Sequence, residues 1–305
     1  DHFSIFLHTF LFDTNILSIM TRYIPFIFVL LWSTGFIGAK YGLPYAEPFT
    51  MLMWRMVIVV PLFFCFVVIL KRPPISLKDA AIQGLVGLLI HGFYLGGVFA
   101  AIAVGMPTGL SSLYVSLNPL LIAIFSGIFL HAVISRREWF SLILGFFGVA
   151  IVLYGASKWE GVISAAGIAW LTLALFSICA GTLIQKKFAQ NVGLVRGSMY
   201  QYAASLALYL ILSFTLETGV VEWNLTFVVT LAWLVIVLSF VAVLLLMYMI
   251  KNGEATRVAS YFYLVPPITV LQGWLLFDEQ LSWLTILGGA LVVIALIMNR
   301  PSKNV

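Results

Sequence analysis

Ten apolar runs of about twenty residues each follow one another along the 305-residue chain. A helix rises ~1.5 Å per residue, so each run is long enough to cross a hydrocarbon core of ~30 Å. Only 9% of the residues are charged and the mean hydropathy is +1.12, which leaves no stretch for a separate water-soluble domain. We therefore predict an all-α polytopic membrane protein with ten transmembrane helices, at about residues 23–40, 49–69, 80–100, 108–130, 139–155, 162–184, 197–216, 226–249, 256–277 and 281–298.

Basic residues are distributed unevenly between the gaps that separate these runs. Thirteen of the sixteen Lys and Arg residues lie before the first run, in or at the edge of every second gap after it, or behind the last run. The other three are Lys40 and Lys158, in or at the edge of the remaining gaps, and Arg55, well inside the second run. Because Lys and Arg in short loops stay on the cytoplasmic side, both termini are expected there. The net charge of +5 then indicates contact with anionic lipid headgroups, not with nucleic acid.

The two halves of the chain repeat one pattern. Matching pairs are Gly105 and Gly253, Thr108 and Thr256, Ser112 and Ser260, Pro119 and Pro267, all at an offset of 148, and also Trp32-Ser33 with Phe176-Ser177 and Trp54-Arg55 with Tyr200-Gln201. We assign residues 21–157 to a first five-helix repeat and residues 158–300 to a second. Residues 1–20 are interpreted as an N-terminal extension outside the fold, either non-native or disordered, with an interfacial helix on the membrane as the alternative.

A repeat of five helices enters the membrane from the opposite side the second time, because five is odd. The charges agree, since the loop with Arg136 and Arg137 is basic and its counterpart at Asp278-Glu279 is acidic. Two inverted five-helix repeats related by a pseudo-two-fold axis are an architecture of secondary transporters. Such a pair has two nearly equivalent packings, one open to each side, so the pattern predicts transport by alternating access.

Several segments resemble the EamA-type family of the drug/metabolite transporter superfamily. They are Trp32-Ser-Thr-Gly-Phe-Ile-Gly-Ala-Lys40, Pro48 with Arg55, Leu117-Asn-Pro119, Val265-Pro-Pro267, Phe277-Asp-Glu279 and Leu287-Gly-Gly289. The resemblance covers about residues 21–299. It implies an exporter of amino acids or similar small metabolites in the bacterial cytoplasmic membrane. One departure is His131, which occupies a position where the family usually has a Glu after the fourth helix.

Arg55 is the first candidate for contact with a substrate. An arginine within a span costs about 2.5–3.5 kcal/mol on insertion scales, and its guanidinium can bind a carboxylate through two parallel hydrogen bonds. The repeat places another polar group, Gln201, at the equivalent depth. The alternative is that Arg55 reaches the outer interface beside Glu47 and serves only packing or orientation.

Further polar candidates lie in the first, third, fourth and ninth runs. His91 shares one helical face with Gln83, Gly87 and Tyr94, and it could bind substrate or carry a proton, or simply be neutral and hydrogen-bonded to a neighbouring helix. The remaining candidates are Ser33, Ser112, Asn118, Tyr263 and Gln272, for which hydrogen bonding between helices is the alternative role. Pro119 and Pro266-Pro267 are expected to free backbone carbonyls near the middle of their spans.

Aromatic residues complete the predicted substrate pocket. Trp32, Trp54, Tyr94, Tyr200 and Tyr263 lie away from the ends of their runs, where their rings could face an ammonium group or a ring, or only pack. Together with Arg55 they favour a zwitterion as substrate. The sequence indicates no catalytic residue, no metal ligand and no cofactor.

Competing functions lack their motifs. The sequence has no phosphate-binding GxxxxGK[ST] loop, no HExxH and no GxSxG, which argues against an ATPase or an intramembrane enzyme. A channel would need a ring of like charges, and the apolar runs do not supply one. A drug or organic-cation transporter, or a phosphorylated-metabolite transporter, of the same fold is the alternative substrate class. The expected partners are a small molecule and the lipid bilayer, and a homodimer is left open.

Overall fold

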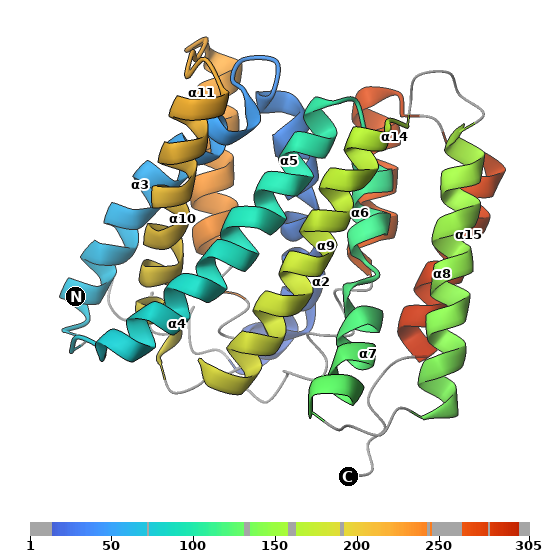
Figure 1. The fold of residues 1–305 in the computed structure, drawn as a ribbon, viewed down its shortest axis with the longest axis horizontal. Helices are drawn as coiled ribbons and strands as arrows, with labels where there is room; N and C mark the ends of the chain where they lie inside the picture. The colour runs from blue at the N-terminus through green and yellow to red at the C-terminus, as the bar shows by residue number, and fades with distance from the viewer. Residues whose placement is uncertain are drawn as a thin grey trace.

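The protein is a bundle of helices that run up and down beside one another (Figure 1). The computed structural model describes residues 14–71, 73–130, 135–157, 163–189, 192–242, 245, 264–279 and 281–298. The helices are α2 (Thr14–Gly42), α3 (Pro48–Ile69), α4 (Leu77–Gly87), η1 (Leu88–Tyr94), α5 (Leu95–Ala103), α6 (Thr108–Val115), α7 (Asn118–Leu130), α8 (Arg136–Ser157), α9 (Ala165–Phe188), α10 (Leu194–Leu216), α11 (Leu225–Ala232), η2 (Trp233–Ala242), α14 (Val265–Phe277) and α15 (Trp283–Met298).

Within the described residues, six helical stretches are long and apolar enough to cross a membrane. They are Tyr23–Gly42, Pro48–Ile69, Leu77–Ala103, Ala165–Phe188, Leu194–Leu216 and Leu225–Ala242. Trp139–Val152, Val265–Phe277 and Trp283–Ala295 are shorter apolar helices. The prediction of an all-helical membrane protein is confirmed, and ten complete crossings stay a prediction.

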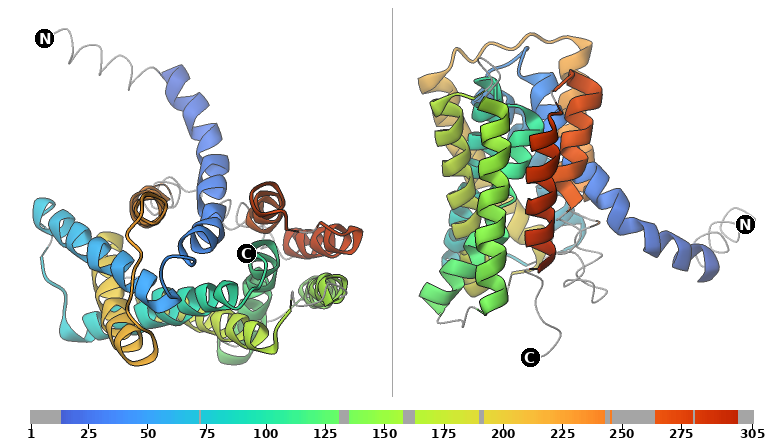
Figure 2. Two further views of the ribbon diagram at one scale, coloured as in Figure 1. Left: turned by 90° about the horizontal axis from the view of Figure 1, so that it is seen from above. Right: turned by 90° about the vertical axis from the view of Figure 1, so that its right-hand side faces the viewer.

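The N-terminal helix is longer than the first apolar run. Residues 14–20, assigned above to an extension, form the first turns of α2. Figure 2 shows this part of α2 projecting away from the bundle, while its second half lies among the other helices. Residues 1–13 lie outside the described part of the chain.

In the part of the chain that the structure describes, three of the predicted spans are interrupted or irregular. The third run is a continuous stretch in which the π-helix η1 joins α4 to α5, and the eighth contains a second π-helix, η2, after α11. In the fourth run the α-helical ladder breaks at Ser116 and Leu117, just before Pro119, and α7 begins at Asn118. Proline clashes with the preceding turn, which explains this break. Each irregularity leaves backbone carbonyls inside the bundle that need partners.

Helices α8 and α15 pack against each other at the edge of the bundle, beside the main group of helices (Figures 1 and 2). They cross at two glycines, because a Cβ atom on Gly288 would lie 2.5 Å from the carbonyl oxygen of Gly148. A Cβ on Gly148 would lie 2.8 Å from the carbonyl oxygen of Gly288. Small residues allow this close backbone approach, which is how helices associate in lipid.

Gly288→Ala is expected to destabilise the bundle, because the obstructing atom belongs to the backbone of α8 and cannot rotate away. Overpacking of this kind costs ~1–3 kcal/mol. The free energy of unfolding should fall by about that amount, and thermal unfolding of the purified protein, followed by tryptophan fluorescence, measures the change.

Gly289→Ala is the matched control. A Cβ at Gly289 would meet only Leu113, at 3.8 Å, which is an ordinary contact. It should leave the melting temperature unchanged or slightly higher. Equal losses in the two variants would show that the crossing point is not as tight as the structure gives it.

Candidate functional site

A buried arginine lies at the centre of the candidate site. Arg55 is on α3, about two turns from Pro48, and only 6% of its surface is exposed. Its Nε and Nη2 atoms donate hydrogen bonds to Ser239 Oγ, at 3.1 and 3.0 Å. Ser239 belongs to η2 and donates in turn to the carbonyl of Leu234, at 3.2 Å. The guanidinium therefore points into the bundle and is held by η2, and it does not reach out towards Glu47.

Aromatic side chains from two other helices surround Arg55. The phenols of Tyr94, on η1, and of Tyr202 and Tyr209, on α10, lie close enough to interact with its charge. The ring of His91 stacks on Tyr202 with centroids 4.3 Å apart. Arg55, His91 and Tyr94, three of the residues that the sequence singles out, are thus brought together here.

Among the described residues, Arg55 has a hydroxyl partner but no carboxylate partner. Within the described residues the only ion pair joins Lys40 and Glu279. Arg55 is also the one charged side chain among the buried polar residues of that part of the chain. A guanidinium with unused donors and no counter-ion is suited to receive an anionic group from a ligand.

Glutamines extend this polar cluster towards one end of the bundle. Gln201 Nε2 donates to Gln83 Oε1 at 2.6 Å, and Gln83 Nε2 donates to the carbonyl of Ala189 at 3.2 Å. A Cβ on Gly87 would collide with the backbone of Gln201. The polar face of Gln83, Gly87 and His91 therefore packs against α10 in this structure. At the level of Gln83 and Gly87 it holds two helices together, with no open space between them.

The π-helix η1 is stabilised by a single tyrosine. Tyr209 Oη lies 2.8 Å from the carbonyl oxygen of His91 and 2.7 Å from that of Gly92. These carbonyls are exposed to a side-chain donor because the π-helical turn displaces them from the usual α-helical ladder. Tyr209 is fully buried, so its hydroxyl is fixed at this position.

A second group of polar atoms lies on α6, α7 and α14. Ser112 donates to the carbonyl of Gly109, within its own helix, at 2.9 Å. Ser111 Oγ, Asn118 Oδ1 and Gln272 Oε1 are buried and have no hydrogen-bond partner among the described residues. Buried polar atoms almost always have partners, so these three are available to a ligand or to water.

The remaining predicted site residues are dispersed. Ser33 is fully buried and bonds to the carbonyl of Leu30, at 2.8 Å, and the ring of Trp32 packs against Phe28. Trp54 lies edge-on to Trp223, with centroids 5.1 Å apart, near the end of the bundle. Tyr200 is half-buried on α10. Tyr263 lies outside the described residues.

Glu279 joins three helices at one end of the bundle. Its Oε1 atom accepts hydrogen bonds from the Thr108 amide at 2.7 Å and from Thr108 Oγ1 at 2.9 Å, and its Oε2 accepts from the Gly109 amide at 3.1 Å. Lys40 Nζ lies 2.8 Å from Oε1. The carboxylate therefore caps the N-terminus of α6 while it is paired with the last turn of α2.

Glu217 caps the N-terminus of α3 at the same end of the bundle. It accepts from the amides of Phe49 and Thr50, at 2.8 and 2.6 Å, and from Thr50 Oγ1 at 2.8 Å. Burial raises the pKa of the Glu217 carboxyl above its ordinary value, although these donors favour its charged form. The carboxylate of Glu47, just before α3, accepts a hydrogen bond from the backbone amide of Thr218, just after α10, at 2.7 Å. Carboxylates thus tie the helices of this end together.

Sequence reasoning missed Ser239, Tyr202 and Tyr209. Ser239 is the single hydroxyl in the apolar run of η2, and the two tyrosines follow Gln201 by one and eight positions on α10. The available signal was the offset of 146 that aligns Arg55 with Gln201, which marks α10 as the counterpart of α3. Among the described residues, no three His, Cys, Asp or Glu side chains gather as metal ligands would.

Comparison with known proteins identifies the family. Residues 23–154 and residues 165–300 each match the sequence profile of the EamA-like transporter family. The chain belongs to this family. An EamA-like transporter is a multi-pass membrane protein, in agreement with the helices and their hydropathy.

Individual relatives of this EamA-like chain are also transporters. The uncharacterized transporter YvbV of Bacillus subtilis is 26% identical over 90% of both chains. The uncharacterized inner membrane transporter YedA of Escherichia coli K12 is 25% identical, over 91% of this chain and 90% of its own. A probable amino-acid metabolite efflux pump of Escherichia coli K12 is 24% identical, over 89% and 91%.

A solved crystal structure has the same fold. It matches with a TM-score of 0.64 and covers 90% of this chain and 94% of its own. Its sequence identity is 18%, so the likeness concerns the fold alone.

Tyr209→Phe is expected to loosen the site, because it leaves two buried carbonyls of η1 without their donor. An unsatisfied buried polar group costs ~1–3 kcal/mol. We expect a lower melting temperature and faster hydrogen exchange of the amides around residues 88–95, measured by mass spectrometry.

Tyr200→Phe is the control on the same helix, since no hydrogen bond of the Tyr200 hydroxyl is found in the described part of the chain. It should change neither quantity. If the amides around residues 88–95 exchange at the wild-type rate in the Tyr209→Phe variant, the Tyr209 hydroxyl does not hold η1.

Proposed function

We propose that this EamA-like protein is a secondary transporter that exports amino acids or similar small metabolites across the bacterial cytoplasmic membrane. The observation that carries the proposal is the buried guanidinium of Arg55, which has a serine as partner and no carboxylate among the described residues. An α-carboxylate of the substrate would supply the missing counter-ion. The efflux pump among the relatives supports the same substrate class.

Magnitudes favour a site that is completed by substrate. Burying a charge costs several kcal/mol even after the protein relaxes. A hydrogen bond to a charged group returns about 1.5–3 kcal/mol, so Ser239 offsets part of that cost. The rest is available as binding energy for an anionic group that reaches the remaining donors.

The surroundings of Arg55 favour a small amphipathic substrate. Tyr94, Tyr202 and the His91 ring offer aromatic faces for an ammonium group or an apolar side chain. Phosphorylated metabolites would require several buried cations, and Arg55 is the one found buried in the described residues. A drug or organic-cation transporter remains the second candidate, because the same aromatic faces suit a cation.

Helix packing supports the ten-helix inverted repeat. Three predicted pairs of equivalent helices pack on each other, namely α3 with α10, α6 with α14 and α8 with α15. Other contacts are exchanged, since α2 packs on α11 and η2 while its counterpart α9 packs on η1 and α5. The π-helices η1 and η2 occupy equivalent third and eighth runs. This is the pattern expected for two halves related by a pseudo-two-fold axis.

The crossing of α8 and α15 supports the same symmetry at the level of residues. With Gly145 aligned to Gly288, Ala295 is aligned to Val152. A Cβ at Gly145 would meet Ala295 at 3.4 Å, and a Cβ at Gly288 would meet Val152 at 2.6 Å. The contact between Gly145 and Ala295 therefore corresponds, under the repeat alignment, to the contact between Gly288 and Val152.

Alternating access requires that each end of the bundle open in turn. We propose that Glu279 is part of the closure at its end, because it connects α2, α6 and α14 in the present state. The basic loops lie at the opposite end, where Arg196 bonds to the carbonyl of Pro73. The charge bias makes that end, with both termini, cytoplasmic, so the Glu279 end faces outward.

Arg55→Gln should abolish transport of the substrate and leave the folded protein in the membrane. The amide keeps a donor for Ser239 but carries no charge for a carboxylate. Uptake of a panel of labelled amino acids and small amines into proteoliposomes measures the effect. Ser239→Ala should retain transport with KM raised several-fold, since it removes only the orientation of the guanidinium.

Arg196→Gln is the matched control, because Arg196 lies at the bundle end and binds a loop carbonyl. It should transport at the wild-type rate. Saturable flux that survives Arg55→Gln would contradict a role for Arg55 in substrate binding. Flux of organic cations alone would favour the second candidate.

Glu279→Gln should open the outward end, because it removes both the charge on the helix cap and the pair with Lys40. A cysteine at position 112, one turn below Thr108 on α6, would report this in a background without Cys65 and Cys179. We expect a membrane-impermeant thiol reagent to modify it at least several-fold faster than in the parent.

Two variants separate the causes. Lys40→Met removes the ion pair and keeps the helix cap, so it should have a smaller effect than Glu279→Gln. Asp278→Asn changes the neighbouring acid, whose side chain has no hydrogen bond or ion pair in the described residues. This variant should leave the rate of thiol modification unchanged. Equal rates in all variants would exclude Glu279 from closure.

A further inference from the structure

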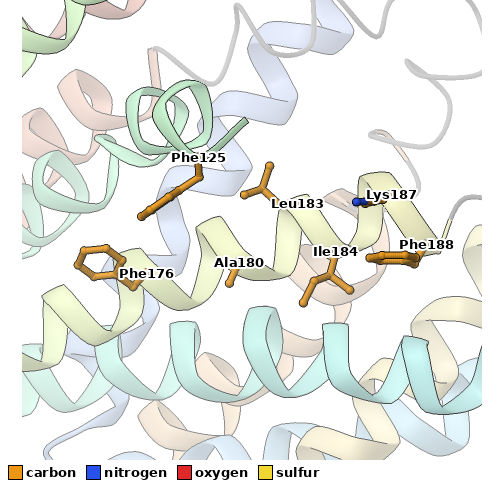
Figure 3. Close-up of a pocket in the computed structure, with 7 residues that line it drawn as sticks. All are labelled: Phe125, Phe176, Ala180, Leu183, Ile184, Lys187 and Phe188. Atoms are coloured by element: carbon orange, nitrogen blue, oxygen red, sulfur yellow. The ribbon is translucent and has the colours of Figure 1, made fainter. Parts of the chain in front are cut away.

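An apolar groove lies between α7 and α9, on the side of α9 that faces away from the core. It has a volume of about 470 Å³ and is lined by Phe125 from α7 and by Phe176, Ala180, Leu183, Ile184, Lys187 and Phe188 from α9 (Figure 3). Lys187 is the one charged residue in this lining.

The groove is separate from the site around Arg55. Helix α9 buries Leu171, Ala174 and Gly181 against α5, η1 and the core. The groove residues lie on the opposite face, where Phe176 is 49% and Phe188 53% exposed. In a transmembrane helix this face meets the acyl chains of the bilayer. An apolar groove open to lipid does not suit a zwitterionic substrate.

The length of the groove matches one leaflet. Phe176 and Phe188 are twelve positions apart, or ~18 Å along a helix, and half of the hydrocarbon core is ~15 Å. Lys187 lies in the last turn of α9, at the end with the basic loops. Its ammonium is 5.4 Å from the centre of the Phe188 ring, so it closes the groove at the depth of the headgroups.

We propose that this groove binds one anionic phospholipid, with an acyl chain against Phe125, Phe176 and Ala180 and the phosphate paired with Lys187. The charge at one end selects the headgroup, and the apolar walls select the chain. The alternative occupant, a second copy of the protein, would need no cation at this position. The proposal does not depend on the transported substrate, because it concerns the outer face of α9.

Native mass spectrometry of the purified protein, titrated with phosphatidylglycerol or phosphatidylcholine of the same acyl chains, tests the proposal. We expect the first phosphatidylglycerol to bind more tightly than the first phosphatidylcholine. Lys187→Gln should weaken the binding of phosphatidylglycerol about fivefold, the ratio that corresponds to ~1 kcal/mol per lysine at an anionic surface. Lys186→Gln is the control, because Lys186 lies about 100° away around the helix, outside the groove.

A second pair of variants tests the walls. Ala180→Phe fills the groove and should weaken the binding of both lipids. Ala169→Phe, which changes an exposed alanine of the same face about three turns earlier, should not. Melting temperatures show whether each variant is folded.

Three results would overturn the proposal. They are equal binding of the two lipids by the wild type, equal losses in Lys186→Gln and Lys187→Gln, and wild-type lipid binding by folded Ala180→Phe. Conversion of a dimer to a monomer by Ala180→Phe, with lipid binding unchanged, would assign the groove to a second copy of the chain.

Discussion

The burial of one guanidinium determines how the centre of this bundle is organised. The Arg55 guanidinium only donates hydrogen bonds, so it cannot lie among apolar helices without acceptors around it. Helix η2 therefore brings Ser239 Oγ within 3.1 Å, and α10 places its tyrosines nearby. These partners come from two helices, η2 and α10, and each is itself held by a backbone carbonyl or a stacked ring. The site is therefore preorganised, and the charge it lacks is the charge that a ligand can bring.

Both π-helices of the described chain contribute to this centre. In η2, Ser239 bonds to Leu234 five residues earlier, and in η1 the carbonyls of His91 and Gly92 accept from Tyr209. A π-turn displaces carbonyls from the α-helical ladder, and such turns are frequent at functional sites. In a membrane, irregular backbone is tolerated where other groups satisfy it. The irregular turns and the buried charge thus support each other.

The all-helical membrane fold could be predicted from the sequence, because apolar length is a local signal. The offset between the halves and the intramembrane charge of Arg55 are local signals as well, and the inverted repeat and the role of Arg55 stay predictions. The sequence could not predict Ser239 as the partner, since register between distant helices depends on η2, and no residue pattern marks a π-turn. The face of Gln83 and His91 was found by helical spacing, but its contact with α10 follows from packing. The cap formed by Glu279 requires the left-handed backbone of Asp278 and the absence of a side chain at Gly273. Neither is visible in composition.

Charge distribution makes the two ends of the bundle unequal although the repeats are related. The offset that aligns Arg55 with Gln201 also aligns Glu47 with Gly193 and Glu217 with Lys71. Glu217 caps α3, whereas among the described residues no side chain caps the first amides of α10 after Gly193. A lysine cannot accept from an amide, and basic residues are what the cytoplasmic side requires. In the orientation proposed above, the positive-inside rule therefore removes the carboxylate caps from the cytoplasmic end, and the carboxylates of the opposite end favour the packing in which that end is closed.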